Sequence, residues 1–144
     1  MNKKKIITKN QKQTLNLGKS FAQRLKGGEV VALYGQLGTG KTTFIKGIGQ
    51  GLKVRQTITS PSFILMKIYP IRKKRIKYLI HLDAYRIKKV EELSDLNVFD
   101  YFNQPDSVCL IEWADRIEKI LPKERINIYF DYGKKENERI IIFQ

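Results

Sequence analysis

The chain has 144 residues, 42% of them hydrophobic, a length and composition that suit one globular domain over residues 1–144. Its 28 lysine and arginine residues against 14 acidic ones give a formal net charge of +14; this favours RNA or an RNA-holding partner, but a lysine-rich surface composition explains it equally well. No apolar stretch approaches the roughly 20 residues of a membrane span, and the basic start lacks a signal peptide's apolar core, so we expect no membrane association and a cytoplasmic location.

Apolar patterns in the first third of the chain predict a strand, a helix and then a second strand–helix unit. A pair of glycines at 27–28 ends the first helix, and a glycine-rich loop separates the next two elements. The predicted elements are a short strand at 6–7, a helix over 10–26, a buried strand at 29–34 and a helix over 42–52.

The rest of the chain predicts a polar loop at 57–62, followed by strands and short helices. The expected elements are strands at 63–69 and 76–82, one or two short helices within 90–102, a strand at 107–111, a helical or loop segment at 112–121, and a terminal hairpin of 126–130 with 139–143. This order predicts an α/β fold with a mixed central sheet flanked by helices.

The most informative motif occupies residues 35–42, which read GQLGTGKT and match the phosphate-binding pattern G-x-x-x-x-G-K-[ST]. Its glycines permit backbone conformations in which successive N–H groups face phosphate oxygens. Lys41 places a charge near the β- and γ-phosphates, and the hydroxyl of Thr42 can ligate Mg²⁺. The nucleotide-binding candidates are therefore Gly35, Gln36, Leu37, Gly38, Thr39, Gly40, Lys41 and Thr42.

Two apolar runs end in an acid, Asp83 after residues 78–82 and Glu112 after residues 108–111. Ligands of open α/β sheets lie beyond the carboxyl ends of the strands, and a phosphate loop needs a carboxylate there to anchor Mg²⁺ or its water shell. Each acid alone could also form a surface ion pair, and spacing does not decide which of them contacts the metal. Because a strand-end acid carries little packing, we expect Glu112→Ala to impair hydrolysis more than folding.

Several other residues have both structural and functional interpretations. His81 is the only histidine, with no second His or Cys at ligand spacing, so we expect a hydrogen-bonded side chain at a strand end. Trp113 either packs over the site or fills core space. Cys109 is the only cysteine, which excludes an internal disulfide, and it reads as a buried core residue. Residues 57–63 fit a switch loop near a γ-phosphate, but a plain Ser/Pro turn fits them as well.

Several segments together resemble the TsaE (YjeE) family, small bacterial ATPases of tRNA threonylcarbamoyladenosine biosynthesis. Many families share the phosphate loop, whereas HLDAYR at 81–86, similar to the family's H-x-D-x-Y-R, and EW at 112–113 are more specific. SPSF at 60–63 resembles the family's S-P-T-F. These matches keep their order and spacing over nearly the whole chain.

The resemblance implies a three-layer P-loop NTPase-like fold that binds ATP or ADP with Mg²⁺ and hydrolyses ATP weakly on its own. It implies the partners TsaB and TsaD, with tRNA reached through their complex, which modifies the adenosine beside the anticodon of tRNAs reading codons that begin with A. By the same resemblance Thr42 and Glu112 are the Mg²⁺ ligands, and Lys41, Asp83 and Glu112 are the candidate catalytic residues. Further site residues implied in this way are Thr43, Thr59, Ser60, Pro61, Ser62, Phe63 and Trp113.

The sequence departs from the family pattern at two positions. Gln36 stands where the family usually has an acid, which removes a charge near the phosphates. Ser62 stands where the family usually has threonine, but it keeps the hydroxyl.

Three other classes of protein fit the sequence less well. A small-molecule or nucleoside kinase would share the loop and the strand-end acid, but it needs an arginine-bearing lid, and only residues 72–75, an expected hairpin tip, offer one. No N-K-x-D guanine-reading motif occurs, which argues against a GTPase. An RNA-binding module with a vestigial loop conflicts with the intact Lys41 and Thr42.

Overall fold

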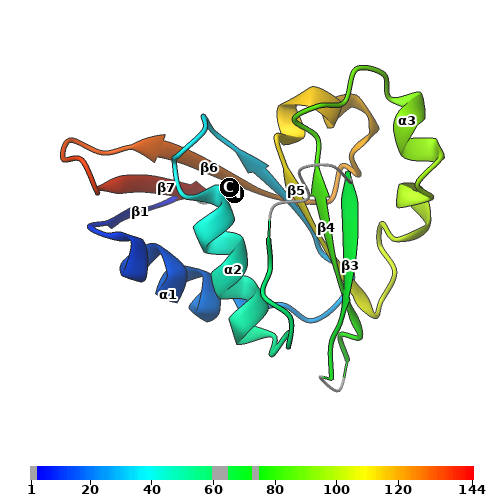
Figure 1. The fold of residues 1–144 in the computed structure, drawn as a ribbon, viewed down its shortest axis with the longest axis horizontal. Coiled ribbons are helices and arrows are strands. Elements are labelled where there is room, and N and C mark those ends of the chain that lie inside the picture. The colour runs from blue at the N-terminus through cyan, green and yellow to red at the C-terminus, as the bar shows by residue number, and fades with distance from the viewer. Residues whose placement is uncertain (1–2, 60–64, 73–74) are drawn as a thin grey trace.

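The computed structural model describes residues 3–59, 65–72 and 75–144, which form a mixed sheet in the order β1-β7-β6-β2-β5-β4-β3 (Figure 1). The four central strands β6, β2, β5 and β4 are mutually parallel, while β3, β7 and β1 pair antiparallel at the two margins. The expected α/β fold on a mixed sheet is therefore confirmed. The strands are β1 (Lys4–Thr8), β2 (Val30–Tyr34), β3 (Met66–Pro70), β4 (Tyr78–Asp83), β5 (Ser107–Glu112), β6 (Ile126–Tyr132) and β7 (Arg139–Phe143).

The helices cover both faces of this sheet unequally (Figure 1). Side chains alternate along a strand, so Val31 and Leu33 of β2 join one hydrophobic cluster while Val30 and Ala32 join another on the opposite face. The first cluster packs beneath the long helices, and the second packs beneath short ones. The helices are α1 (Gln11–Ala22), α2 (Lys41–Gly51), α3 (Glu91–Ser94), and the 3₁₀ segments η1 (Val98–Asp100) and η2 (Ala114–Ile120).

The predicted elements agree with the structure in kind, and their bounds differ by a few residues. The first helix ends earlier than expected, at Ala22, and begins after Asn10, whose Oδ1 accepts from the Gln13 N–H at 2.8 Å. The predicted strand at 63–69 begins at Met66 among the described residues. Residues 60–64 and 73–74, including parts of the predicted loop and hairpin tip, lie outside the described residues. Across residues 3–59, 65–72 and 75–144, no helix has the length and apolar character needed to span a membrane.

Helices α1 and α2 approach closely through two glycines. A Cβ atom on Gly47 would lie 2.1 Å from the carbonyl oxygen of Leu15, and one on Gly18 would lie 2.2 Å from the carbonyl oxygen of Phe44. Both obstacles are backbone atoms, which cannot rotate away as a side chain does. The two glycines therefore fix the position of α1 against α2.

We expect Gly47→Ala to lower the free energy of unfolding by about 1–2 kcal/mol. Alanine gains about 1 kcal/mol of helix propensity over glycine, but its Cβ must displace α1, and overpacking of this kind costs typically about 1–3 kcal/mol. Thermal unfolding followed by circular dichroism measures the change. Lys46→Ala, at the exposed neighbouring position of the same helix, is the matched control and should stay within about 0.5 kcal/mol. A Gly47→Ala melting temperature at or above the wild-type value would contradict the close contact.

Candidate functional site

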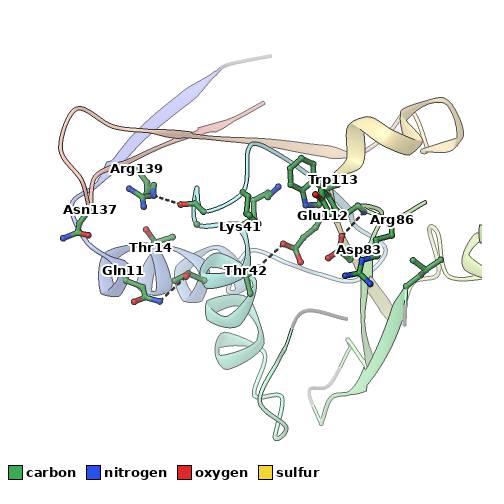
Figure 2. A pocket seen from close by; sticks show the side chains of 16 residues that line it. Gln11, Thr14, Lys41, Thr42, Asp83, Arg86, Glu112, Trp113, Asn137 and Arg139 are labelled. Carbon is green, nitrogen blue, oxygen red and sulfur yellow. Dashed lines mark hydrogen bonds between the residues drawn. The ribbon is translucent and has the colours of Figure 1, made fainter. Parts of the chain in front are cut away.

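A cavity of about 460 Å³ opens where α2 begins and the parallel strands β4 and β5 end (Figure 2). Its volume falls within the roughly 300–1,000 Å³ typical of small-molecule sites. Lys41 and Thr42 lie between two groups of lining residues, one near α1 and the last hairpin, the other at the ends of β4 and β5. The first group is Gln11, Thr14, Asn137 and Arg139, and the second includes Asp83, Arg86, Glu112 and Trp113.

The loop between β2 and α2 requires glycine at two positions. Gly35 has φ of 143°, and a Cβ there would lie 2.6 Å from the carbonyl oxygen of Phe130. Gly40 has φ of 102° and caps α2, whose first residue is Lys41. Both φ values belong to the left-handed region that side chains disfavour. The unpaired N–H groups of the first turn of α2 and its positive dipole end therefore lie at the cavity, an arrangement suited to an anion.

Side-chain hydrogen bonds to three successive carbonyl groups orient this loop. The carbonyl oxygens of residues 36, 37 and 38 accept, in that order, from Thr39 Oγ1 at 2.6 Å, from the hydroxyl of Tyr132, and from Arg139 Nε at 3.1 Å. In a planar trans peptide the N–H points opposite to the C=O. Each bond therefore also fixes the direction of the following N–H group.

Lys41 is buried, with 4% of its surface exposed. Its Nζ donates to the carbonyl of the first loop glycine and lies 3.6 Å from the centroid of the Trp113 ring. Burial lowers the pKa of Lys41, and the nearby carboxylates of Glu112, Asp83 and Asp115 oppose this shift. The result is a partly desolvated ammonium group, whose attraction to a bound anion is stronger than it would be in water.

The carboxylate of Glu112 is held on both sides. It is 3% exposed; its Oε1 accepts from Thr42 Oγ1 at 3.1 Å, and its Oε2 lies 2.7 Å from His81 Nε2. Asp83 stands opposite Glu112 in the register of β4 and β5, and its Oδ1 accepts from the N–H of Tyr85 at 2.9 Å. Both acids thus end a strand, as expected, and the structure adds that the two strands are neighbours in the sheet.

The oxygen atoms of Thr42 and Glu112 fit the ligand preferences of Mg²⁺. This ion usually takes one or two carboxylates and completes its shell with water and substrate phosphates. Within the described ranges, no group of three or more His, Cys, Asp or Glu side chains gathers to hold a metal. An ion at this position would therefore depend on phosphate and water for its remaining ligands.

The structure also shows the surroundings of four other residues considered in the sequence analysis. Trp113 lines the cavity, so of its two interpretations packing over the site fits the structure; its φ of 57° is unusual for a side chain of this size. His81 is hydrogen-bonded, as expected. Cys109 is buried, and burial raises its pKa to about 12, which agrees with a core residue. Gln36 is exposed, and only the backbone of this residue takes part in the loop's bonds given above.

The residues implied by resemblance are only partly described. Thr43 lines the cavity, and its Oγ1 lies 3.5 Å from Gln11 Nε2. Thr59 accepts a hydrogen bond from Lys67 Nζ at 2.8 Å. Ser60, Pro61, Ser62 and Phe63 lie outside the described residues, so the nucleotide-sensing loop stays a prediction.

Sequence reasoning missed one side of the cavity. Gln11, Asn137 and Arg139 line it, yet none belongs to a chemical motif. Their approach depends on the packing of α1 against α2 and on the pairing of β6 with β7. A single sequence carries no local signal for such contacts.

Comparisons with known proteins place the chain in one family. The family model described as "Threonylcarbamoyl adenosine biosynthesis protein TsaE" matches residues 8–141. The "tRNA threonylcarbamoyladenosine biosynthesis protein TsaE" of Bacillus subtilis is 38% identical over 143 residues, which cover 99% of this chain and 86% of the relative. The protein of the same description from Haemophilus influenzae is 40% identical over 123 residues, covering 82% of this chain and 75% of the relative. A crystal structure of YdiB from Bacillus subtilis matches with a TM-score of 0.75 at 37% identity, covering 99% of this chain and 84% of that one.

Proposed function

Because the chain belongs to the TsaE family and thus to tRNA threonylcarbamoyladenosine biosynthesis, we propose that it is an ATPase that binds and hydrolyses Mg-ATP to support the partner proteins TsaB and TsaD. The observation that carries this proposal is the meeting of Lys41, Thr42 and Glu112 at one cavity. A buried cation, a hydroxyl and a carboxylate beside a helix N-terminus are the groups that phosphoryl transfer needs.

Different groups at the cavity are proposed to bind the phosphates and the metal ion. The loop N–H groups and the Lys41 ammonium would bind the β- and γ-phosphates, and Thr42 and Glu112 would hold Mg²⁺. The 3.1 Å contact between Thr42 and Glu112 favours Glu112 over Asp83 as the direct ligand. When bound, the ion neutralises charge on the phosphate oxygens.

Hydrolysis requires an oriented water and an acceptor for its proton. A water oxygen forms a bond to the γ-phosphorus while the bond from that phosphorus to the bridging oxygen breaks, leaving ADP and inorganic phosphate. Asp83 lines the cavity next to Glu112 in the sheet register, so we assign it to orient this water and receive its proton. The Trp113 ring lies against the Lys41 ammonium, 3.6 Å from its centroid to Nζ.

The proposal also includes a three-layer fold and two partner proteins. The strand–loop–helix unit at 30–51 and the parallel neighbours of β2 support a three-layer P-loop NTPase-like fold. Family membership supports TsaB and TsaD as partners, with tRNA reached through their complex. The charge of +14 is compatible with a surface near RNA in such an assembly.

ATP hydrolysis by this protein, measured alone and with purified TsaB and TsaD, tests the proposed function. We expect a low rate for the protein alone and a clear stimulation by the pair together with Mg²⁺. Free phosphate and ADP must appear in equal amounts. Phosphate found on a small acceptor instead of in solution would replace the ATPase with the kinase alternative, and no nucleotide turnover under any of these conditions would overturn the proposal.

A further inference from the structure

His81 is a fully buried polar side chain next to the site, and the roles proposed above leave it without a function. The ring is 0% exposed, and its Nε2 lies 2.7 Å from Glu112 Oε2. The other ring nitrogen, Nδ1, is buried and has no hydrogen-bond partner among the described residues. A buried polar atom without a partner costs folding free energy, which an apolar residue of similar size would avoid. What the imidazole provides, and an apolar residue could not, is the hydrogen bond to Glu112.

The direction of this hydrogen bond follows from the chemistry of its partners. A carboxylate that ligates a metal ion is ionised and can only accept, so the hydrogen between the two side chains belongs to Nε2. His81 therefore donates to Glu112 Oε2. The other oxygen, Oε1, accepts from Thr42 at 3.1 Å, as Figure 2 shows.

The two contacts give the two carboxylate oxygens different surroundings, one facing the protein interior and the other facing the cavity. The imidazole occupies Oε2 from the side of β4, so Oε1 is the oxygen presented beside the Thr42 hydroxyl. With both oxygens held, the carboxylate cannot rotate freely about its last bond. Groups that hydrogen-bond a metal-ligating carboxylate in this way orient it and tune its affinity for the ion.

The strand register explains how the histidine reaches this position. His81 and Asp83 are two residues apart on β4 and so share one face, and Asp83 lies opposite Glu112 on β5. The same face carries Leu79 and Leu110, which belong to the cluster beneath α2. His81 therefore contacts Glu112 on the neighbouring strand, while Asp83 lines the cavity.

We propose that His81 is a positioning residue that fixes the Glu112 carboxylate with one oxygen toward Thr42, and thereby sets the affinity of the nucleotide site for Mg²⁺. This inference rests on the proposed Mg-ATP function. His81 touches neither nucleotide nor metal and acts only through Glu112.

Two substitutions separate this role from packing. His81→Gln keeps a donor near the position of Nε2, whereas His81→Leu fills the same space without one. Binding of ADP and ATP can be followed by the fluorescence of Trp113, the only tryptophan, in EDTA and over a series of Mg²⁺ concentrations. We expect His81→Leu to bind nucleotide in EDTA as the wild type does, but to need about 10–100-fold more Mg²⁺ for its half-maximal effect. His81→Gln should restore most of the wild-type Mg²⁺ response.

A second measurement needs no variant at all. Because His81 is the only histidine, a long-range ¹⁵N–¹H NMR spectrum of the wild-type protein reports its tautomer without an assignment problem. We expect the Nε2–H form. An Nδ1–H form overturns the proposal, as does a folded His81→Leu protein with wild-type Mg²⁺ dependence. If His81→Leu does not fold, the tautomer and the His81→Gln response decide the matter. A wild-type protein that binds no nucleotide with or without Mg²⁺ would instead contradict the proposed function.

Discussion

Lys41→Met is expected to reduce ATP hydrolysis by at least about 100-fold, the usual loss when one preorganised donor to a developing charge is removed. The Lys41 ammonium is buried at the start of α2, directly after the glycine loop. Methionine keeps an unbranched stem against the Trp113 ring but brings no charge. Steady-state hydrolysis and nucleotide titration measure the loss.

The same substitution should leave the fold nearly intact. Burial lowers the pKa of Lys41 from its usual 10.5, so the charged form is disfavoured in the folded state relative to the unfolded chain. A lysine shifted in this direction weakens the fold at neutral pH, and this cost disappears only as the pH rises past both pKa values. We therefore expect a melting temperature within about 5 °C of wild type. Lys46→Met, exposed on the same helix, is the control that should retain full hydrolysis.

Glu112→Gln is expected to lower hydrolysis by about 100–1,000-fold while the protein still folds and binds nucleotide in the absence of Mg²⁺. Glutamine keeps the shape of the side chain, and its carbonyl oxygen can still accept from Thr42. Its amide nitrogen can donate to His81 Nε2 once the imidazole proton moves to Nδ1. Single-turnover hydrolysis separates the loss of chemistry from a loss of binding, and an unchanged rate would contradict the role proposed for Glu112.

Glu112→Ala is the less suitable variant, and here the sequence-based expectation is wrong about packing. Glu112 is 3% exposed and is bonded to both Thr42 and His81, so it is not a loosely packed acid at a strand end. Alanine would leave two buried polar partners unsatisfied, at a cost of about 1–3 kcal/mol for each group. The alanine variant should therefore unfold at a lower temperature than the glutamine variant, and thermal unfolding of the pair checks this.

Local patterns predicted much of this fold because β2 and most of β5 are continuous apolar runs. The five residues of β2 are all buried, as are the six of β5, and each run is followed by the group that contributes to the site: the glycine loop after Tyr34, and Glu112 at the end of β5. Such runs mark the strands, and the carboxyl ends of parallel strands mark the ligand. The ends of helices were predicted less accurately. The first helix was expected to continue to the glycines at 27–28, but it ends at Ala22, where no glycine marks the end.

The parts that could not be predicted depend on contacts between distant segments. The sequence gives no indication that Arg139 lies beside residue 38, or that Gln11 reaches Thr43, because each contact follows from the packing of whole elements. The pairing of His81 with Glu112 likewise needs the order of β4 and β5 in the sheet. Motif spacing placed both residues at strand ends but not next to each other.

The bonds from Tyr132 and Arg139 to the phosphate loop have a consequence for synthesis on the ribosome. Residues 35–42 leave the exit tunnel long before residues 132–139, which carry the side chains that hold carbonyls 37 and 38. Strand β1 is likewise made first but pairs only with β7, which is among the last strands to emerge. During translation at about 5–20 residues per second, the nascent chain therefore carries a complete nucleotide motif for several seconds without the hairpin that shapes it. The loop therefore gains the hairpin contacts that orient it only at the end of synthesis, after most of the sheet is available to fold.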